Sequence, residues 1–133
     1  AESNSALDNA VDWVIQATGK EPILVYASAP PDAVKEAQQR LGRDLASSTV
    51  ENALAKIARA AVQNGFRRIV VAGGETAGAV VSKLGIKGIM IGEQIDPGVP
   101  TTVSIGNPSI GLVLKSGNFG SADFFEKALK VMP

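Results

Sequence analysis

Apolar residues recur every three or four positions in several stretches of the chain, a spacing that gathers them on one face of a helix. In the first stretch, for example, Leu7, Val11 and Val14 follow this spacing. Glycine and proline residues bound these stretches, as they do at many helix ends. The pattern predicts five helices: between Ser5 and Gly19, from Pro31 to Gly42, between Ser48 and Gly65, from Thr76 to Leu84, and from Ser121 onward.

Hydroxyl residues stand at most of these expected helix starts, where a side-chain oxygen can accept a free backbone N–H. Two of them are followed three residues later by an acidic residue, the spacing of a capping box. The candidate caps are Ser5 with Asp8, Ser48 with Glu51, Thr76, and Ser121.

Short apolar runs without helical spacing predict the strands. The runs at 22–28, 69–72 and 110–115 are almost continuously apolar, which is typical of parallel strands covered on both faces. Runs at 89–91 and 101–105 flank the tight turn at 96–98, so we expect this pair to be partly antiparallel.

Helices alternate with strands through the first two thirds of the chain, whereas strands cluster in the last third. This order predicts an α/β fold: a three-layer sandwich with a mostly parallel or mixed sheet of about five strands and helices on both faces. At 133 residues, the length suits a single domain spanning 1–133.

The strongest candidate site is the turn Gly73-Gly74-Glu75-Thr76-Ala77-Gly78, which joins a buried strand to a helix. Glycines allow unusual backbone conformations and leave no side chain over a ligand. Free N–H groups and the helix dipole at such a turn suit a phosphate. The pattern is neither a Walker A loop nor a dinucleotide-binding fingerprint. An ordinary tight turn with no ligand is the alternative interpretation.

A second turn of this kind, Lys115-Ser116-Gly117-Asn118-Phe119-Gly120, also follows a strand. Ser116, Asn118 and backbone amides are candidates for phosphate or ribose contacts, Lys115 for a positive charge, and Phe119 for covering an adenine. In the alternative interpretation, Asn118 and the glycines satisfy left-handed conformations and Phe119 belongs to the core. Because ligands of open α/β sheets bind at the carboxyl ends of strands, the two turns together favour a nucleotide site.

The amino-acid composition limits the classes of partner, catalytic site and metal site that this chain can have. The chain is 45% apolar and 20% charged, with 13 basic and 13 acidic residues and no polybasic run, so we expect neither a nucleic acid nor a membrane as partner. No apolar run approaches the roughly 20 residues of a spanning helix. Cysteine and histidine are both absent, which excludes disulfides, a Ser-His-Asp triad and most transition-metal sites. The lack of cysteine fits a cytoplasmic location.

Three carboxylates expected in loops are candidates for holding Mg²⁺: Glu75, Glu93 and Asp96. Glu75 is the strongest because it lies inside the first glycine-rich turn; plain solvation is the alternative for each. Trp13 lies off the apolar stripe of its helix, so it either faces another domain or covers an edge of the core. An exposed apolar face there would also favour a homo-oligomer.

Three blocks of the chain resemble the four-carbon acid sugar kinase family, which was long catalogued as a domain of unknown function. They are Gly73-Gly74-Glu75-Thr76-Ala77-Gly78-Ala79-Val80, the block from Ile91 to Pro100, and the block from Leu114 to Gly120 with Asp123-Phe124-Phe125. The resemblance extends upstream through Val25-Tyr26-Ala27-Ser28 and Leu41-Gly42-Arg43, and so covers nearly the whole chain.

The resemblance implies a role in carbohydrate metabolism. Enzymes of this family use ATP to phosphorylate acid sugars such as 3-oxo-tetronate, threonate or erythronate on the terminal hydroxyl. Their N-terminal domain binds the sugar acid and their C-terminal domain binds the nucleotide; this chain resembles the latter part of the C-terminal domain. The family's ATP contacts match Gly73 to Thr76 with Ala77, and Gly117.

Two parts of the family pattern are not found in this sequence: the sugar-acid domain, and a serine-rich segment before the first helix. The chain, which begins without methionine, is therefore interpreted as a piece of a longer two-domain kinase and is expected to be inactive alone. The resemblance does not assign the catalytic base. A non-catalytic nucleotide-binding module and, less favoured, a sugar-phosphate-binding isomerase-like domain remain the alternatives.

Overall fold

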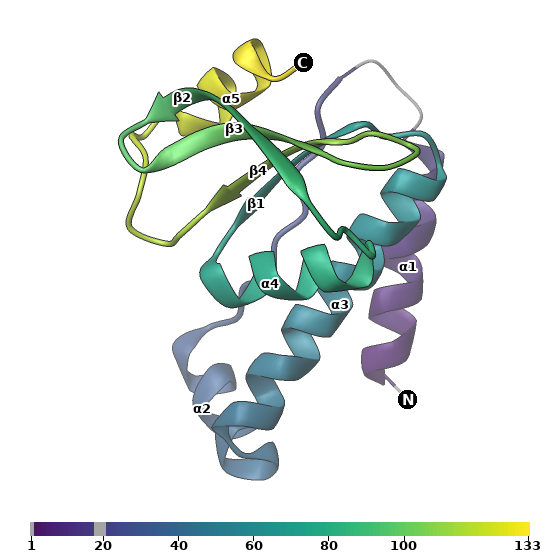
Figure 1. Cartoon of the computed structure of the whole chain (residues 1–133). Coiled ribbons are helices and arrows are strands. Elements are labelled where there is room, and N and C mark those ends of the chain that lie inside the picture. The colour runs from purple at the N-terminus through teal and green to yellow at the C-terminus, as the bar shows by residue number, and fades with distance from the viewer. Residues whose placement is uncertain (1, 18–20) are drawn as a thin grey trace.

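A computed structural model of the chain describes residues 2–17 and 21–133. Five helices and four strands follow one another along this part of the chain (Figure 1). Their order is α1 (Glu2–Gln16), α2 (Pro31–Leu41), α3 (Arg43–Gln63), β1 (Arg68–Ala72), α4 (Gly74–Lys83), β2 (Ile89–Asp96), β3 (Val99–Ser104), β4 (Gly111–Lys115) and α5 (Phe124–Val131).

The strands form one mixed sheet in the order β1-β4-β3-β2. β1 and β4 are parallel, whereas β3 pairs antiparallel with both β2 and β4. The antiparallel hairpin that the turn at 96–98 predicts is therefore confirmed, and Gly98 adopts the positive φ of 81° that such a turn requires. The predicted α/β sandwich is confirmed, with four strands in the described part of the chain instead of about five.

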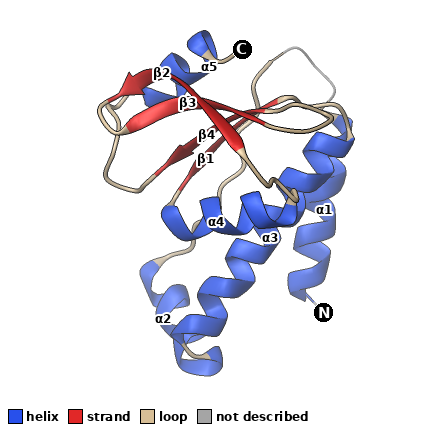
Figure 2. Ribbon diagram, in the orientation of Figure 1, coloured by secondary structure: helices blue, strands red, loops and turns tan. Residues whose placement is uncertain are grey.

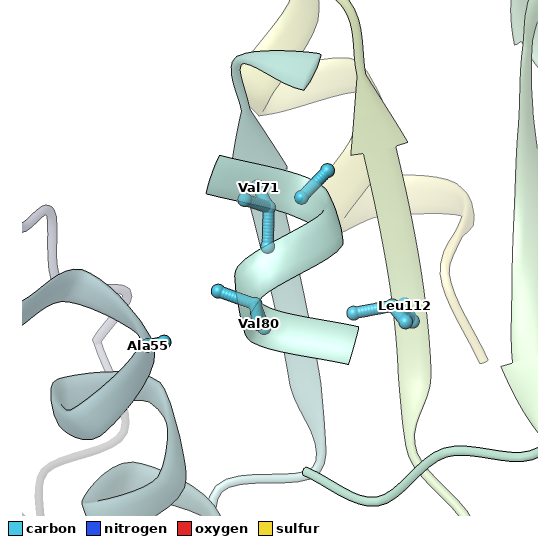
Figure 3. Packing of buried hydrophobic residues seen from close by; sticks show 5 residues of the cluster. Ala55, Val71, Val80 and Leu112 are labelled. Atoms are coloured by element: carbon cyan, nitrogen blue, oxygen red, sulfur yellow. The ribbon is translucent and has the colours of Figure 1, made fainter. Parts of the chain in front are cut away.

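Alternate side chains of the central strands pack into two hydrophobic cores, one on each face of the sheet. On one face, Val71 and Leu112 pack with Ala55 of α3 and with α4; Figure 3 shows Val80 of α4 between Ala55 and Leu112. On the other face, Val113 packs with Phe124 of α5. Helices thus cover both faces (Figure 2). The continuous apolar runs of β1 and β4 follow from this double burial.

The predicted strand at 22–28 is wrong: residues 21–30 run without regular secondary structure and belong to no described strand pair. Ile23 and Val25 are half-buried, while Leu24 and Tyr26 are exposed. The run is apolar enough for a strand, but a strand also needs a hydrogen-bonded neighbour, and β4 is the described strand that pairs with β1. The parallel part of the sheet therefore has two strands instead of three.

The predicted helix caps are also wrong, although the helices themselves form. α1 begins before Ser5, and α3 begins at Arg43, so Ser48 lies inside a helix and its hydroxyl donates to the Leu45 carbonyl. Hydroxyls within helices bond to the preceding turn in this way, which removes them from capping. α4 and α5 begin at Gly74 and Phe124 without a side-chain cap. Gly19, the predicted end of the first helix, lies outside the described residues.

Candidate functional site

The two glycine-rich turns lie side by side because β1 and β4 are adjacent parallel strands. Ala72, the last residue of β1, is in register with Lys115, the last residue of β4. The backbone N–H of Gly73 donates to the Lys115 carbonyl over 2.8 Å, so the first turn is bonded to the start of the second. The chain thus gathers both candidate segments at one edge of the sheet, where open α/β folds bind ligands.

The first turn presents three backbone amides at the start of α4. Gly73 has a φ of 110°, and its own N–H is already used. The N–H groups of Gly74, Glu75 and Thr76 have no acceptor within the described part of the chain, as expected for the first turn of a helix. Together with the positive end of the helix dipole, they form a place suited to an anion.

Ala77 and Gly78 have different surroundings, although both are candidate site residues. The Ala77 side chain is buried in the core between α3, α4 and the sheet, and its N–H donates to the Gly73 carbonyl over 2.8 Å. Gly78 is exposed on α4. The structure therefore turns Ala77 away from the open side of the turn and leaves Gly78 on the surface.

Some glycines of the two turns are required by a positive φ, whereas others stand where a residue with a side chain would also fit. Gly73 and Gly120 have positive φ, and a Cβ on Gly120 would lie 2.7 Å from the Phe124 ring. Gly74, Gly78 and Gly117 have ordinary φ, and a Cβ on any of them would meet nothing within 4 Å. The fold accommodates side chains at these three positions, so the space above them is open to a ligand.

In the second turn, the positive charge of Lys115 is held within the loop. Its Nζ donates to the carbonyls of Gly117 at 2.9 Å and Ser116 at 3.2 Å, and it lies 5.9 Å from the centre of the Phe124 ring. The side chains of Ser116 and Asn118 are exposed and have no hydrogen-bond partner in the described structure. The loop thus offers two free polar side chains beside a fixed ammonium group.

An open groove between α3 and α4 adjoins the first turn. It has a volume of about 830 Å³, and its polar lining includes Arg43, Ser47, Glu51 and Glu75. Desolvation, together with the hydrogen bond and the negative charge of Glu75, raises the pKa of Glu51 above its ordinary value. The sequence predicts only a capping role for Glu51, because nothing in a linear pattern places it beside Glu75 of α4.

The other carboxylates are placed differently from the prediction. Glu93 lies within β2 instead of a loop, and Asp96 is bonded to Ser121 and Lys127. The described residues hold no group of three or more histidine, cysteine, aspartate or glutamate side chains suited to a metal ion. Glu75 remains the candidate ligand for Mg²⁺, and the carboxyl group of Glu51 beside it supplies further oxygen atoms of the kind that this ion prefers.

A second surface is apolar. A shallow hollow of about 330 Å³ between α1 and residues 21–30 is lined by Ala10, Trp13, Leu24, Val25 and Tyr26. Trp13 is exposed, as its position off the helical stripe predicts. None of the described helices is long and apolar enough to cross a membrane.

Comparison with known proteins gives consistent matches. Residues 1–125 match the family model of the nucleotide-binding C-terminal domain. The 3-oxo-tetronate kinase of Burkholderia multivorans is 56% identical over 112 residues, which are 84% of this chain and 26% of that protein. The 3-oxo-tetronate kinase of Haemophilus influenzae is 46% identical over 123 residues, 92% of this chain and 30% of that protein.

A solved structure shows the same fold. The crystal structure of Haemophilus influenzae protein HI1011 superimposes with a TM-score of 0.81 at 44% identity, covering 94% of this chain and 30% of that one. The chain thus spans between a quarter and a third of the length of the relatives it matches.

Proposed function

The chain belongs to the nucleotide-binding C-terminal domain family, and from this we propose that residues 1–133 form a single ATP-binding domain of a longer, two-domain kinase. The parent enzyme would transfer a phosphoryl group to the terminal hydroxyl of a four-carbon acid sugar, of the 3-oxo-tetronate, threonate or erythronate type. The names of the relatives support the kinase class and the acid-sugar substrate.

The observation that carries the proposal is the joined pair of glycine-rich turns at the ends of β1 and β4. In the proposed site, the amides of Gly74, Glu75 and Thr76 hold phosphate oxygens. Gly117 lets the second turn approach the nucleotide closely, since no side chain stands there. Ser116 and Asn118 then donate to phosphate oxygens or exchange hydrogen bonds with ribose hydroxyls, and the Lys115 ammonium group adds a positive potential from its place within the loop.

Glu75 is the proposed Mg²⁺ ligand, directly or through water. Bound Mg²⁺ neutralises phosphate charge and supplies electrostatic stabilisation of the transferring group. The Glu51 carboxyl group adjoins Glu75, and desolvation, followed by the hydrogen bond and the negative charge of Glu75, raises the pKa of Glu51. A cation at Glu75 would lower the pKa of Glu51.

Phosphoryl transfer depends chiefly on positioning and charge stabilisation, which this chain can supply without histidine. In the proposed reaction, the acceptor hydroxyl forms a bond to the γ-phosphorus, the bond to the bridging oxygen breaks, and ADP leaves. The acceptor and the base that takes its proton are assigned to the rest of the enzyme. We therefore expect this chain alone to bind nucleotide without turning over acid sugar.

The apolar hollow around Trp13 and Tyr26 is the proposed contact surface for the remainder of the kinase. The relatives are about three to four times as long as the matched region, so they contain additional chain to cover it. In the alternative, a second copy of this chain covers the same apolar residues, forming a homo-oligomer. Because the reaction consumes ATP, we propose a cytoplasmic location for the parent enzyme.

A non-catalytic nucleotide-binding module is the second candidate, supported by the nucleotide-binding family to which the chain belongs. Calorimetric titration with Mg·ATP, a tetronate and a sugar phosphate separates both nucleotide-binding candidates from an isomerase-like domain. Saturable binding of Mg·ATP alone supports the proposal. Preference for the sugar phosphate favours an isomerase-like domain, and turnover of the tetronate by this chain alone contradicts the assignment of the acceptor site to other segments.

The variant that tests this turn is Gly74→Val, since a Cβ at this position would meet no other atom of the fold within 4 Å. It should abolish Mg·ATP binding while the melting temperature stays close to that of the wild type. Unchanged affinity in a folded variant contradicts the phosphate-binding role of this turn.

A further inference from the structure

A third loop, the turn between β2 and β3, lies at the same edge as the two glycine-rich turns. Because β3 runs antiparallel to β4, the start of β3 lies near the end of β4. The ring of Phe119, from the second turn, packs on the bare backbone of Gly98: a Cβ there would lie 2.6 Å from the ring. The hairpin turn thus contacts the loop that carries Gly117.

Asp96, at the end of β2, ties the two loops together. Its Oδ2 accepts the backbone N–H of Ser121 at 2.9 Å and lies 2.9 Å from the Ser121 hydroxyl. Its Oδ1 accepts from Lys127 Nζ at 3.0 Å. Both carboxylate oxygens are therefore engaged, and the side chain is 12% exposed. We call Asp96, Ser121 and Lys127 the Asp96 clamp.

The loop between Lys115 and Ser121 has few other restraints. The Lys115 Nζ donates to the carbonyls of Ser116 and Gly117, and the Phe119 N–H donates to the Ser116 carbonyl at 3.1 Å. Ser116, Gly117 and Asn118 are exposed. The far end of the loop is fixed by the clamp, through Asp96 at the end of β2, and by the contact of Phe119 with Gly98 of the β2–β3 turn.

We propose that Asp96 is a positioning residue for nucleotide binding: its clamp holds residues 116–121 in the shape that presents Gly117 and Asn118 to the ligand. This rests on the proposed function, because it names what orders one half of that site. Without the clamp, the loop must be ordered on binding, which lowers affinity even when the domain remains folded.

Asp123 provides a matched control within the same cluster. Its Oδ1 lies 2.6 Å from the Ser121 hydroxyl and 3.3 Å from Lys127 Nζ, so Asp123→Asn removes a carboxylate that shares both partners. Asp123 stands directly before α5 and, within the described part of the chain, makes no hydrogen bond or ion pair with the β2–β3 turn; its side chain is 60% exposed. Neutralising it changes the local charge but leaves the two loops tied.

The test compares wild type, Asp96→Ala, Asp96→Asn and Asp123→Asn by calorimetric titration with Mg·ATP, at a temperature where each variant is folded. Asp96→Ala should weaken binding about tenfold or more, Asp96→Asn less, and Asp123→Asn by no more than about twofold. Wild-type affinity in Asp96→Ala, or an equal loss in Asp123→Asn, overturns the proposal. Asp96→Asn keeps the shape of the side chain and serves if the alanine variant does not fold.

Hydrogen exchange of the Phe119 amide tests the clamp without any ligand. Its rate should rise about fivefold or more in Asp96→Ala and Asp96→Asn and stay unchanged in Asp123→Asn. Failure of the wild type to bind Mg·ATP contradicts the proposed function; the exchange rate then decides the clamp separately. An unchanged rate in both Asp96 variants overturns the clamp whatever the titrations show.

Discussion

Apolar residues are buried on both faces of the sheet, whereas several of those in the N-terminal segments are exposed. In β1 and β4, neighbouring apolar side chains are buried on opposite faces, because α3 and α4 cover one face and α5 covers the other. In α1 and residues 21–30, Trp13, Leu24 and Tyr26 remain exposed. The same kind of apolar run therefore becomes core where neighbours exist on both sides and becomes surface where the described chain supplies a neighbour on one side only.

Substitutions of two leucines give the most direct test of this difference in burial. Leu112 of β4 is 0% exposed, whereas Leu24 is 64% exposed. Leu112→Ala should lower the free energy of unfolding by about 2–5 kcal/mol, since it removes buried methyl groups and leaves a cavity. Leu24→Ala should change it by less than about 0.5 kcal/mol. Urea denaturation measures both, and comparable losses would contradict the difference in burial.

Two glycines of the second turn sharpen the distinction between fold and site. Gly120→Ala should cost about 1–3 kcal/mol, because Gly120 has a φ of 93° and a Cβ would press on Phe124. Gly117→Ala should leave the unfolding free energy within about 0.5 kcal/mol and weaken Mg·ATP binding. Thermal unfolding and titration of each variant check the pair. A Gly117→Ala variant that is destabilised but binds normally would reverse the assignment.

A smaller, stabilising change is expected on the surface of α4. Gly78 lies inside the helix, and a Cβ there meets nothing within 4 Å. Gly78→Ala should therefore raise the free energy of unfolding by about 0.5–1 kcal/mol through helix propensity. Chemical denaturation measures the gain, and a loss of stability would show that this side of α4 is packed more tightly than the structure indicates.

The smallest expected effect is on the pH dependence of stability, to which the carboxyl groups of Asp96 and Glu51 contribute in opposite directions. The Ser121 N–H, then Lys127 and the Ser121 hydroxyl, lower the pKa of Asp96. Its stabilisation is therefore present above the ordinary aspartate pKa of about 3.9 and is lost as the pH falls through the folded value. The raised pKa of Glu51 acts the other way, with stability lost as the pH rises through its folded value.

Melting temperatures between about pH 3 and pH 7 separate the two groups. Asp96→Asn should flatten the acid side of the profile, and Glu51→Gln should flatten the side above the ordinary glutamate pKa. A wild-type profile that neither substitution alters would contradict both electrostatic environments.

Local signals predicted much of this fold. Pro31 and Gly42 bound a helix as expected, and the turn at 96–98 joins an antiparallel hairpin. The two glycine-rich turns follow their strands because short-range sequence encodes a strand, a turn and a helix. The caps failed because a hydroxyl can bond either to a free N–H or to a carbonyl one turn back, and sequence spacing does not distinguish the two.

Relations between distant residues could not be predicted. The bond from Gly73 to Lys115 depends on which strands become neighbours, and the contacts of Asp96 with Ser121 and of Glu51 with Glu75 cross between separate elements. The run at 22–28 shows the converse, because its composition favours a strand while the described chain supplies no strand partner. The binding roles of the two turns stay predictions, and the glycine variants test them.

Amide chemical shifts during a titration with Mg·ATP test the central claim most directly. The account predicts progressive shifts at Gly74, Glu75, Thr76 and Gly117, with little change at Gly106, in the loop after β3 at the far end of β4. Saturable binding that leaves these four amides unmoved and shifts the surface around Trp13 would contradict a nucleotide site at the joined turns.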